Sequence, residues 1–281
     1  MLTYKIKSAA KINLALNITG KLNKLHKIES IVSFVDLYDL IFIKKTNKSK
    51  HHISFHGKFS KNIGKKNTVS RLLDVLEKKK LLNKKKFHIK VMKNIPQKAG
   101  LGGGSMNSAY ILNFLEKKKF INITHEKKIE ISNLIGSDVV LGINPVSSIL
   151  NSKGIVTRFL SCPRYYTLLV KPHFGCSTKT IFSKVKKFTK SKYNKPKKLM
   201  FSQKYLSNQE NHLEKIAVSK YSKLRQIKNF LLESNNLSFV RMTGSGSVMV
   251  AYFQSKQDCE IAKIKFKKKF KNYWCYTAKT I

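Results

Sequence analysis

The sequence predicts an α+β protein with two lobes. Strand-like alternation and helix-like spacing of apolar residues follow one another along the 281 residues without an internal repeat. A glycine-rich loop stands between a predicted strand and a predicted helix, and the apolar pattern resets around residues 150–160. We therefore expect an N-terminal lobe over residues 1–155 and a C-terminal lobe over residues 156–281.

The first part of the chain reads mainly as strand. Apolar residues alternate with polar or small ones from Ile12 to Ile18 and stop at Gly20, which predicts a half-buried strand. Further patterns follow in order: strands over residues 28–43 and 53–55, a helix over residues 68–82 and a strand over residues 87–91.

The segment PQKAGLGGGSMNSA, residues 96–109, predicts a phosphate-binding loop. Pro96 prevents a helix before the loop, and glycines at positions 100, 102, 103 and 104 allow positive φ and a close approach of backbone to ligand. Apolar residues then recur at helical spacing, with Ser105 as the expected helix cap. The free N–H groups and the dipole at a helix start attract an anion.

Other phosphate loops fit this segment poorly. A Walker A loop ends in Gly-Lys-Ser/Thr, whereas Gly104 is followed directly by Ser105. A dinucleotide fingerprint needs an acidic residue about twenty positions on, where Thr124 follows a lysine run. No HRD or DFG triplet of a protein kinase occurs, and the ordered apolar run after the loop argues against a flexible linker.

The second part of the chain mixes helices and strands. A helix over residues 127–136 ends at Gly136, and a later one over residues 177–185 begins at Ser177 or Thr178. The lysine-rich residues 186–198 predict an exposed loop. The remaining expectations are a strand over residues 165–170, helical structure over 208–233, a strand over 248–253, a helix over 256–270 and a strand near Trp274.

Composition narrows the class of protein. The formal net charge of +43 suggests a nucleic-acid or membrane partner, but the lysines are spread through nearly every segment and nucleic-acid motifs are absent. The four cysteines are far apart, and His51, His52 and His56 have no cysteine or carboxylate near them, so no metal motif stands out. The chain lacks a membrane-length apolar run and a secretory N-terminus, which favours a cytoplasmic protein.

Two charged residues differ from the solvated lysine runs. Asp138 precedes the apolar run Val139 to Leu141, where a carboxylate either caps a helix or works in a site. Lys11 lies in the strand-forming segment AAKINLAL beside small alanines. A lysine in such a place is more commonly an edge residue with its amine in solvent, so its role depends on the rest of the pattern.

Three segments together resemble the GHMP kinases, the superfamily of galactokinase, homoserine kinase and mevalonate kinase. They are AAKINLALNITG at residues 9–20, IPQKAGLGGGSMNSA at residues 95–109 and RMTGSGSVMVAYF at residues 241–253, and they occur in the family's order. The resemblance implies a ribosomal protein S5 domain 2-like N-lobe and a ferredoxin-like C-lobe, with ATP and a small-molecule acceptor bound between them. It implies ATP and Mg²⁺ as cofactors, a monomer or homodimer, and no nucleic-acid or membrane partner.

The resemblance also implies roles for individual residues. Lys11 matches the lysine that polarises the acceptor hydroxyl, and Asp138 matches the general base. Ser105 is in addition a partner for magnesium. The ATP loop comprises Pro96, Lys98, Ala99, Gly100, Leu101, Gly102, Gly103, Gly104 and Ser105, and the substrate contacts comprise Asn13, His26, Phe182, Gly244 and Ser245.

Within this family the motifs are most similar to those of the members that phosphorylate a methylerythritol linked to cytidine diphosphate. His26 would read the cytosine edge and Phe182 would stack on its ring. Leu25 stands where these members carry a stacking tyrosine, which removes aromatic surface. A GHMP kinase acting on homoserine or mevalonate is therefore the first alternative, and a basic nucleic-acid-binding protein is the second.

Overall fold

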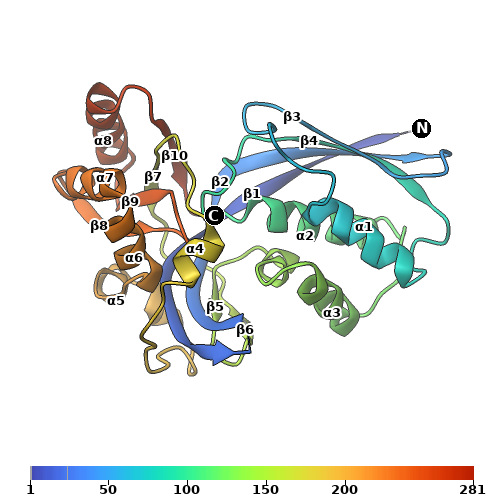
Figure 1. Cartoon of the computed structure of the whole chain (residues 1–281), viewed down its shortest axis with the longest axis horizontal. Helices are drawn as coiled ribbons and strands as arrows, with labels where there is room; N and C mark the ends of the chain where they lie inside the picture. The colour runs from blue at the N-terminus through green and yellow to red at the C-terminus, as the bar shows by residue number, and fades with distance from the viewer. Residues whose placement is uncertain (1, 24) are drawn as a thin grey trace. The chain divides into compact units, whose positions relative to one another are not determined.

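The computed structural model describes residues 2–23 and 25–281, and the chain forms two compact units (Figure 1). Unit 1 comprises Met1–Ala10, Leu37–Gln97 and Gly102–Pro145, and unit 2 comprises Lys11–Asp36, Lys98–Leu101 and Val146–Ile281. The chain therefore passes between the units within its first two strands and again within the glycine loop. Among the described residues, no helix has the length and apolar character needed to cross a membrane.

Unit 1 combines a mixed sheet with three helices. The long strands β1 (Thr3–Leu22) and β2 (Leu25–Thr46) pair with each other, β2 pairs antiparallel with β4 (Lys86–Met92), and β4 pairs parallel with β3 (His52–His56). Helices α1 (Thr68–Lys78), α2 (Gly103–Lys117) and α3 (His125–Ile135) lie together on one side of these strands (Figure 1). A short 3₁₀ helix, η1 (Val139–Ile143), follows α3.

The core of unit 1 lies between the sheet and the helices. Ile89 and Val91 of β4 meet Leu72 and Leu76 of α1 and Leu112 of α2 in one buried apolar cluster. The helical spacing of leucines predicts this face of α1, since residues four apart lie on the same side of a helix. Apolar burial of this kind is the main stabilising force for the lobe.

Unit 2 is built on an antiparallel sheet in the order β10-β7-β9-β8. With helices after β7 and after β9, this is the βαββαβ order of a ferredoxin-like fold, as the resemblance implies. The strands are β7 (Tyr166–Lys171), β8 (Leu237–Met242), β9 (Met249–Phe253) and β10 (Trp274–Lys279). The N-terminal half of β2 pairs with β5 (Ser148–Leu150), which pairs with β6 (Val156–Arg158).

Helices cover this sheet in unit 2. They are α4 (Thr178–Phe182), α5 (Gln203–Ser207), α6 (His212–Lys220), α7 (Ser222–Leu232) and α8 (Lys256–Lys269), with the 3₁₀ helix η2 (Lys198–Phe201) before α5. Leu168 and Ala251 of the sheet share a buried cluster with Leu213 of α6, Ile227 of α7 and Phe266 of α8. Each unit thus has a hydrophobic core of its own.

Most predicted elements are present, and three predictions need correction. Strands β5, β6 and β8 were not predicted, because two of them have only three residues and β8 follows directly on a helical region. The strand around Ile12 is buried on both faces, not half-buried, because its polar residues bond inside the protein. Residues 186–198 are not simply an exposed loop, since Tyr193 is fully buried.

Candidate active site

The glycine loop leads directly into helix α2. Gly102 is the N-cap residue, with a left-handed φ of 65°, and no side chain caps the helix. The prediction that Ser105 caps the helix is therefore wrong, because the positive φ of Gly102 begins the helix earlier and places Ser105 in its first turn. Gly102 has no side chain to accept from the first N–H groups of α2, and the first turn carries no acidic residue. This helix start suits an anion.

Two further glycines are closely packed against neighbouring side chains. A Cβ on Gly103 would lie 3.0 Å from Ile95 Cγ2 and 3.2 Å from Lys93 Nζ. A Cβ on Gly104 would lie 3.1 Å from the hydroxyl of Thr68, which donates a 2.7 Å hydrogen bond to the Gly104 carbonyl. The loop is thus held against the start of α1 and the end of β4, and a side chain would displace it.

A buried carboxylate organises the residues before the loop. Asp39 of β2 is fully buried and forms an ion pair with Lys93. Its oxygens also accept hydrogen bonds from the backbone N–H of Asn94 at 2.8 Å, the N–H of Ile95 at 2.9 Å and the side-chain amide of Asn107 at 3.0 Å. These contacts join the end of β4 to helix α2, and the sequence analysis did not identify them.

Asp138 follows helix α3 in unit 1. It is half-buried at the N-cap position of η1, and its side chain makes no cap hydrogen bond. A Cβ on the neighbouring Gly136 would lie 3.9 Å from the hydroxyl of Ser105. The segment that carries Asp138 therefore lies beside the first turn of α2, and the Asp138 side chain does not cap η1.

In unit 2, Lys11 and Asn13 lie on the buried part of β1. Lys11 is only 3% exposed, and its amine donates a 2.6 Å hydrogen bond to Asn13 Oδ1. The same oxygen accepts from the Gly244 N–H at 2.9 Å, while the Asn13 N–H donates to the Thr243 hydroxyl at 3.0 Å. The structure thereby joins the AKINL segment to the TGSGS turn, 230 residues further along the chain.

The first part of the glycine loop also packs on this turn. Gly100 has a φ of 78°, and a Cβ there would lie 1.9 Å from the Thr243 carbonyl oxygen. The Thr243 hydroxyl donates to the Gly100 carbonyl at 3.0 Å, and the Lys11 N–H donates to the Leu101 carbonyl at 3.1 Å. Residues 98–101 are therefore seated on β1 and on the turn between β8 and β9.

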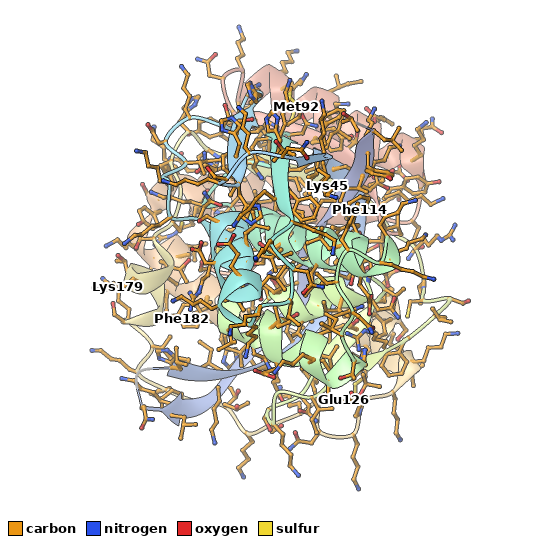
Figure 2. All side chains as sticks on the ribbon, turned by 90° about the vertical axis from the view of Figure 1, so that its right-hand side faces the viewer. Lys45, Met92, Phe114, Glu126, Lys179 and Phe182 are labelled. Carbon is orange, nitrogen blue, oxygen red and sulfur yellow. The ribbon has the colours of Figure 1, made fainter. Side chains whose placement is uncertain are left out.

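The predicted base-reading residues also meet in unit 2. The ring centroids of His26 and Phe182 are 5.2 Å apart, with the rings tilted by 45°. Figure 2 shows Phe182 on the short helix α4 near Lys179. Burial, and then the charge of Lys21, lower the pKa of His26 from its ordinary value, which favours the uncharged imidazole. Ser245 shares a 2.9 Å hydrogen bond with Thr178 at the start of α4.

The structure thus brings the predicted residues together in three groups. Gly102 to Ser105 lie beside the Asp138 segment in unit 1. In unit 2, Lys11 and Asn13 lie with Gly100 and Gly244, and His26 lies with Phe182. Thr243 and Asp39 were missed, although an acid inside the apolar strand pattern of β2 was a usable signal for Asp39. Pro96, Ala99 and Leu101 are buried within the loop, whereas Lys98 is exposed.

Other candidate sites are less developed. A cavity of about 450 Å³ in unit 2 is lined by residues such as His173, Tyr221 and Tyr273, and none of its lining residues was a predicted site residue. Within the described ranges, no group of three or more His, Cys, Asp or Glu residues is arranged to hold a metal ion. Cys162, Cys176, Cys259 and Cys275 are all free thiols.

An uncapped helix start after a glycine loop is typical of a protein that binds phosphate groups. Comparison with known proteins identifies the family to which this protein belongs. The family model for the N-terminal domain of GHMP kinases matches residues 67–150, and the model for their C-terminal domain matches residues 185–272.

Curated relatives match along the whole chain. The 4-diphosphocytidyl-2-C-methyl-D-erythritol kinase of Pelagibacter ubique is 55% identical over 281 residues, which is 100% of each protein. The enzyme of the same name from Clostridium perfringens strain SM101 is 31% identical, over 99% of this chain and 98% of that protein.

Solved structures share the fold. A crystal structure of 4-(cytidine 5'-diphospho)-2C-methyl-D-erythritol kinase has a TM-score of 0.79 at 19% identity and covers 98% of this chain and 99% of that one. A homoserine kinase from Cytophaga hutchinsonii has a TM-score of 0.75 at 15% identity, covering 99% and 94% of the two chains. The chain belongs to the GHMP kinases and, among them, to the family of its 4-diphosphocytidyl-2-C-methyl-D-erythritol kinase relatives.

Proposed function

We propose that this kinase transfers the γ-phosphoryl group of ATP to the 2-hydroxyl of 4-diphosphocytidyl-2-C-methyl-D-erythritol. The products are the 2-phosphate and ADP, and the step belongs to non-mevalonate isoprenoid precursor synthesis. The observation that carries the proposal is the 55% identity over the full length of both chains with the Pelagibacter ubique kinase of that substrate. The free thiols suit a reducing cytoplasm, and we expect a monomer or homodimer that needs neither nucleic acid nor membrane.

The glycine loop is the proposed phosphate seat for ATP. Gly102 begins α2 without a side-chain cap, and close packing at Gly103 and Gly104 leaves little room for side chains in this turn. Backbone N–H groups therefore meet the phosphates, and they supply fixed dipoles that need little reorganisation during transfer. Pro96, Lys98 and the residues up to Ser105 form this loop.

Magnesium fits the donor chemistry at the start of α2. Mg²⁺ takes few protein oxygens and keeps waters and substrate phosphates as its other ligands. Ser105 offers a hydroxyl in the first turn of α2, beside the Gly136 segment. When bound with ATP, the ion would neutralise charge on the phosphate oxygens.

Asp138 and Lys11 are the proposed catalytic residues. The Asp138 carboxylate makes no helix-cap hydrogen bond, and we assign it the removal of the proton from the 2-hydroxyl. Lys11 is buried and has its amine on Asn13, so its charge is held in one place, where it stabilises the developing alkoxide. The proton leaves the hydroxyl for the carboxylate, and the oxygen attacks the γ-phosphorus as the bond to ADP breaks.

The remaining predicted residues form the proposed acceptor site. The uncharged imidazole of His26 can donate and accept one hydrogen bond each, which matches the mixed edge of cytosine. Phe182 adds an aromatic face. Asn13 Oδ1 is already shared by Lys11 and Gly244, so a substrate contact would use its amide nitrogen, while Gly244 and Ser245 line the same turn.

An acceptor comparison tests the proposal. The purified protein is incubated with labelled ATP, Mg²⁺ and one of three acceptors: the cytidine substrate, homoserine or mevalonate. We expect labelled product with the cytidine substrate alone. Equal or faster transfer to homoserine or mevalonate would show that the 55% identical relative misleads about the acceptor.

A variant tests the mechanism separately. Asp138→Ala removes the proposed base, a half-buried side chain that makes no helix-cap hydrogen bond. We therefore expect the variant to fold but to lose phosphoryl transfer. The matched control is Asp74→Ala, which removes an exposed carboxylate from helix α1. Turnover by Asp138→Ala close to that of the unmodified protein would refute the assignment of this base.

A further inference from the structure

We propose that Phe188 supplies the second aromatic surface of the cytosine site and takes the place of the tyrosine that Leu25 replaces. The proposal rests on the function proposed above and adds a residue that determines substrate specificity. It assigns a role to the lysine-rich segment of residues 186–198, which the sequence patterns predict only as an exposed loop.

The aromatic residues meet around His26. The ring centroid of Phe188 lies 6.4 Å from that of His26 with a tilt of 55°, and Phe182 lies 5.2 Å away with a tilt of 45°. Neither phenyl ring stacks flat on the imidazole, so the imidazole does not cover the face of either ring. A pyrimidine that bonds to the His26 edge would therefore have aromatic carbon from both residues close to it.

Exposure distinguishes the two candidates for the missing surface. The Leu25 side chain is 77% exposed and offers only aliphatic carbon. Phe188 is 48% exposed, so about half of a large apolar ring remains open to solvent next to His26. Stacking of a base on such a ring covers apolar surface and adds the preference of flat rings for one another.

The segment that carries Phe188 is hydrogen-bonded to β2, the strand that carries His26, and to its neighbour β1. The N–H of the next residue, Thr189, donates to the Ile18 carbonyl of β1 at 2.9 Å. On β2, three residues after His26, the buried carboxylate of Glu29 accepts from the hydroxyl of Ser191 at 2.6 Å and from the N–H of Lys192 at 2.8 Å.

The Glu29 carboxylate has further donors. It accepts from the Tyr193 N–H at 3.1 Å and from the Asn17 amide at 2.9 Å. A buried carboxylate is costly unless it is bonded in this way, and here the bonds order a loop. Because the loop is fixed before the substrate binds, Phe188 loses less conformational entropy on stacking.

The charge of the segment suits the rest of the ligand. Its exposed lysines are Lys186, Lys187, Lys190, Lys192, Lys195, Lys197 and Lys198. A diphosphate attached to the base carries negative charge, and a cluster of amines attracts it without requiring a fixed contact. The segment therefore combines an aromatic ring for the base with cations for the phosphates.

The test is Phe188→Ala in the full-length enzyme. We expect KM for the cytidine substrate to rise about tenfold, because base stacking on an aromatic side chain is of that order. KM for ATP and kcat should stay within about twofold, since the ring lies outside the phosphate loop. The control is Tyr276→Ala, which removes a partly exposed aromatic residue from β10 and should leave both KM values unchanged.

A rescue variant separates stacking from a structural role. Leu25→Tyr, added to Phe188→Ala, should restore most of the lost affinity, whereas Leu25→Tyr alone should change KM by less than about threefold. An unchanged KM for the cytidine substrate in Phe188→Ala, or an equal rise for ATP, would overturn the inference. Failure of the unmodified enzyme to use that substrate would instead refute the proposed function, and with it the cytosine site.

Discussion

Two of the loop positions favour glycine, one through its backbone conformation and the other through both its conformation and its neighbouring atoms. Gly102 starts helix α2 because its φ of 65° lies in the region that L side chains seldom adopt. Gly100 combines a φ of 78° with a Cβ position only 1.9 Å from the Thr243 carbonyl oxygen. At Gly100 both the backbone conformation and the neighbouring turn exclude a side chain.

Gly100→Ala should lower the free energy of unfolding and weaken ATP binding together. The matched control is Gly154→Ala, because Gly154 has a similar φ of 82° but no heavy atom within 4 Å of a Cβ. The control should cost about 1 kcal/mol from the backbone alone, and Gly100→Ala at least about 2 kcal/mol more from the clash. Urea unfolding and KM for ATP measure the two effects, and equal losses in both variants would contradict the steric explanation.

The asparagine of the AKINL segment also shows why a single side chain acquires its role from distant partners. Asn13 Oδ1 serves Lys11 and the Gly244 N–H, and its own amide donates to Ser30 at 2.8 Å. Asn13 therefore links β1 to the TGSGS turn, and it is also a candidate substrate contact. A sequence motif alone does not separate these two roles.

The strand, loop and helix around the phosphate seat depend on one buried ion pair. Asp39 of β2 holds Lys93 and two backbone N–H groups at the end of β4, and it also bonds to Asn107 of α2. Because Asp39, Lys93 and Asn107 are buried, removal of one partner leaves the others unsatisfied.

Lys93→Met should therefore destabilise unit 1 by about 3–5 kcal/mol, since it leaves the Asp39 carboxylate buried without its cation. The double variant Lys93→Met with Asp39→Leu should recover part of this loss, because no charge then remains in the core. Urea unfolding of both variants measures the difference. A double variant that is less stable than the single one by the full cost of Asp39→Leu would show that the two residues are not coupled.

The conformation of residues 186–198 also depends on a buried carboxylate, that of Glu29. Glu29→Gln keeps the shape but turns an amide N–H₂ toward donors such as Ser191 and the Tyr193 N–H. We expect trypsin to cut after Lys190 or Lys192 at least about tenfold faster than in the unmodified protein. Glu233→Gln, on the surface at the end of α7, is the control, and equal cleavage rates in the two variants would rule out this anchor.

For the whole molecule, the excess of positive charge is the dominant physical property. There are 57 Lys and Arg residues against 14 Asp and Glu residues. Figure 2 shows blue-tipped side chains projecting outward around the whole edge of the view. This distribution fits a general drift toward lysine better than one dedicated nucleic-acid surface.

Self-repulsion among these lysines predicts an unusual response to salt. Raising NaCl from about 20 mM to about 300 mM shortens the screening length several-fold and should raise Tm by several degrees. The sign follows because a net charge of +43 opposes the compact state, whereas screening weakens only a small number of surface ion pairs. Thermal unfolding followed by circular dichroism checks it, and a fall in Tm would mean that attractive pairs dominate.

Local patterns were enough for most of the secondary structure and for the glycine loop that leads into α2. The apolar spacing in α1 and β4, and the glycines before α2, act over a few residues, so a linear reading finds them. The family could also be predicted from the sequence, because each of its three motifs is a continuous stretch of the chain. Short strands such as β5 and β6 escaped this reading because three residues carry no measurable period.

Long-range folding supplied what no local pattern contains. Thr243 meets Asn13 across 230 residues, and Glu29 gathers Ser191, Lys192 and Tyr193 across more than 160 residues. Whether a buried polar residue is tolerated depends on donors brought from such distances, which sequence spacing does not reveal. The glycine loop is therefore legible in the chain, but its seat on Thr243, the carboxylate beneath α2 and the placing of Phe188 beside His26 follow only from packing.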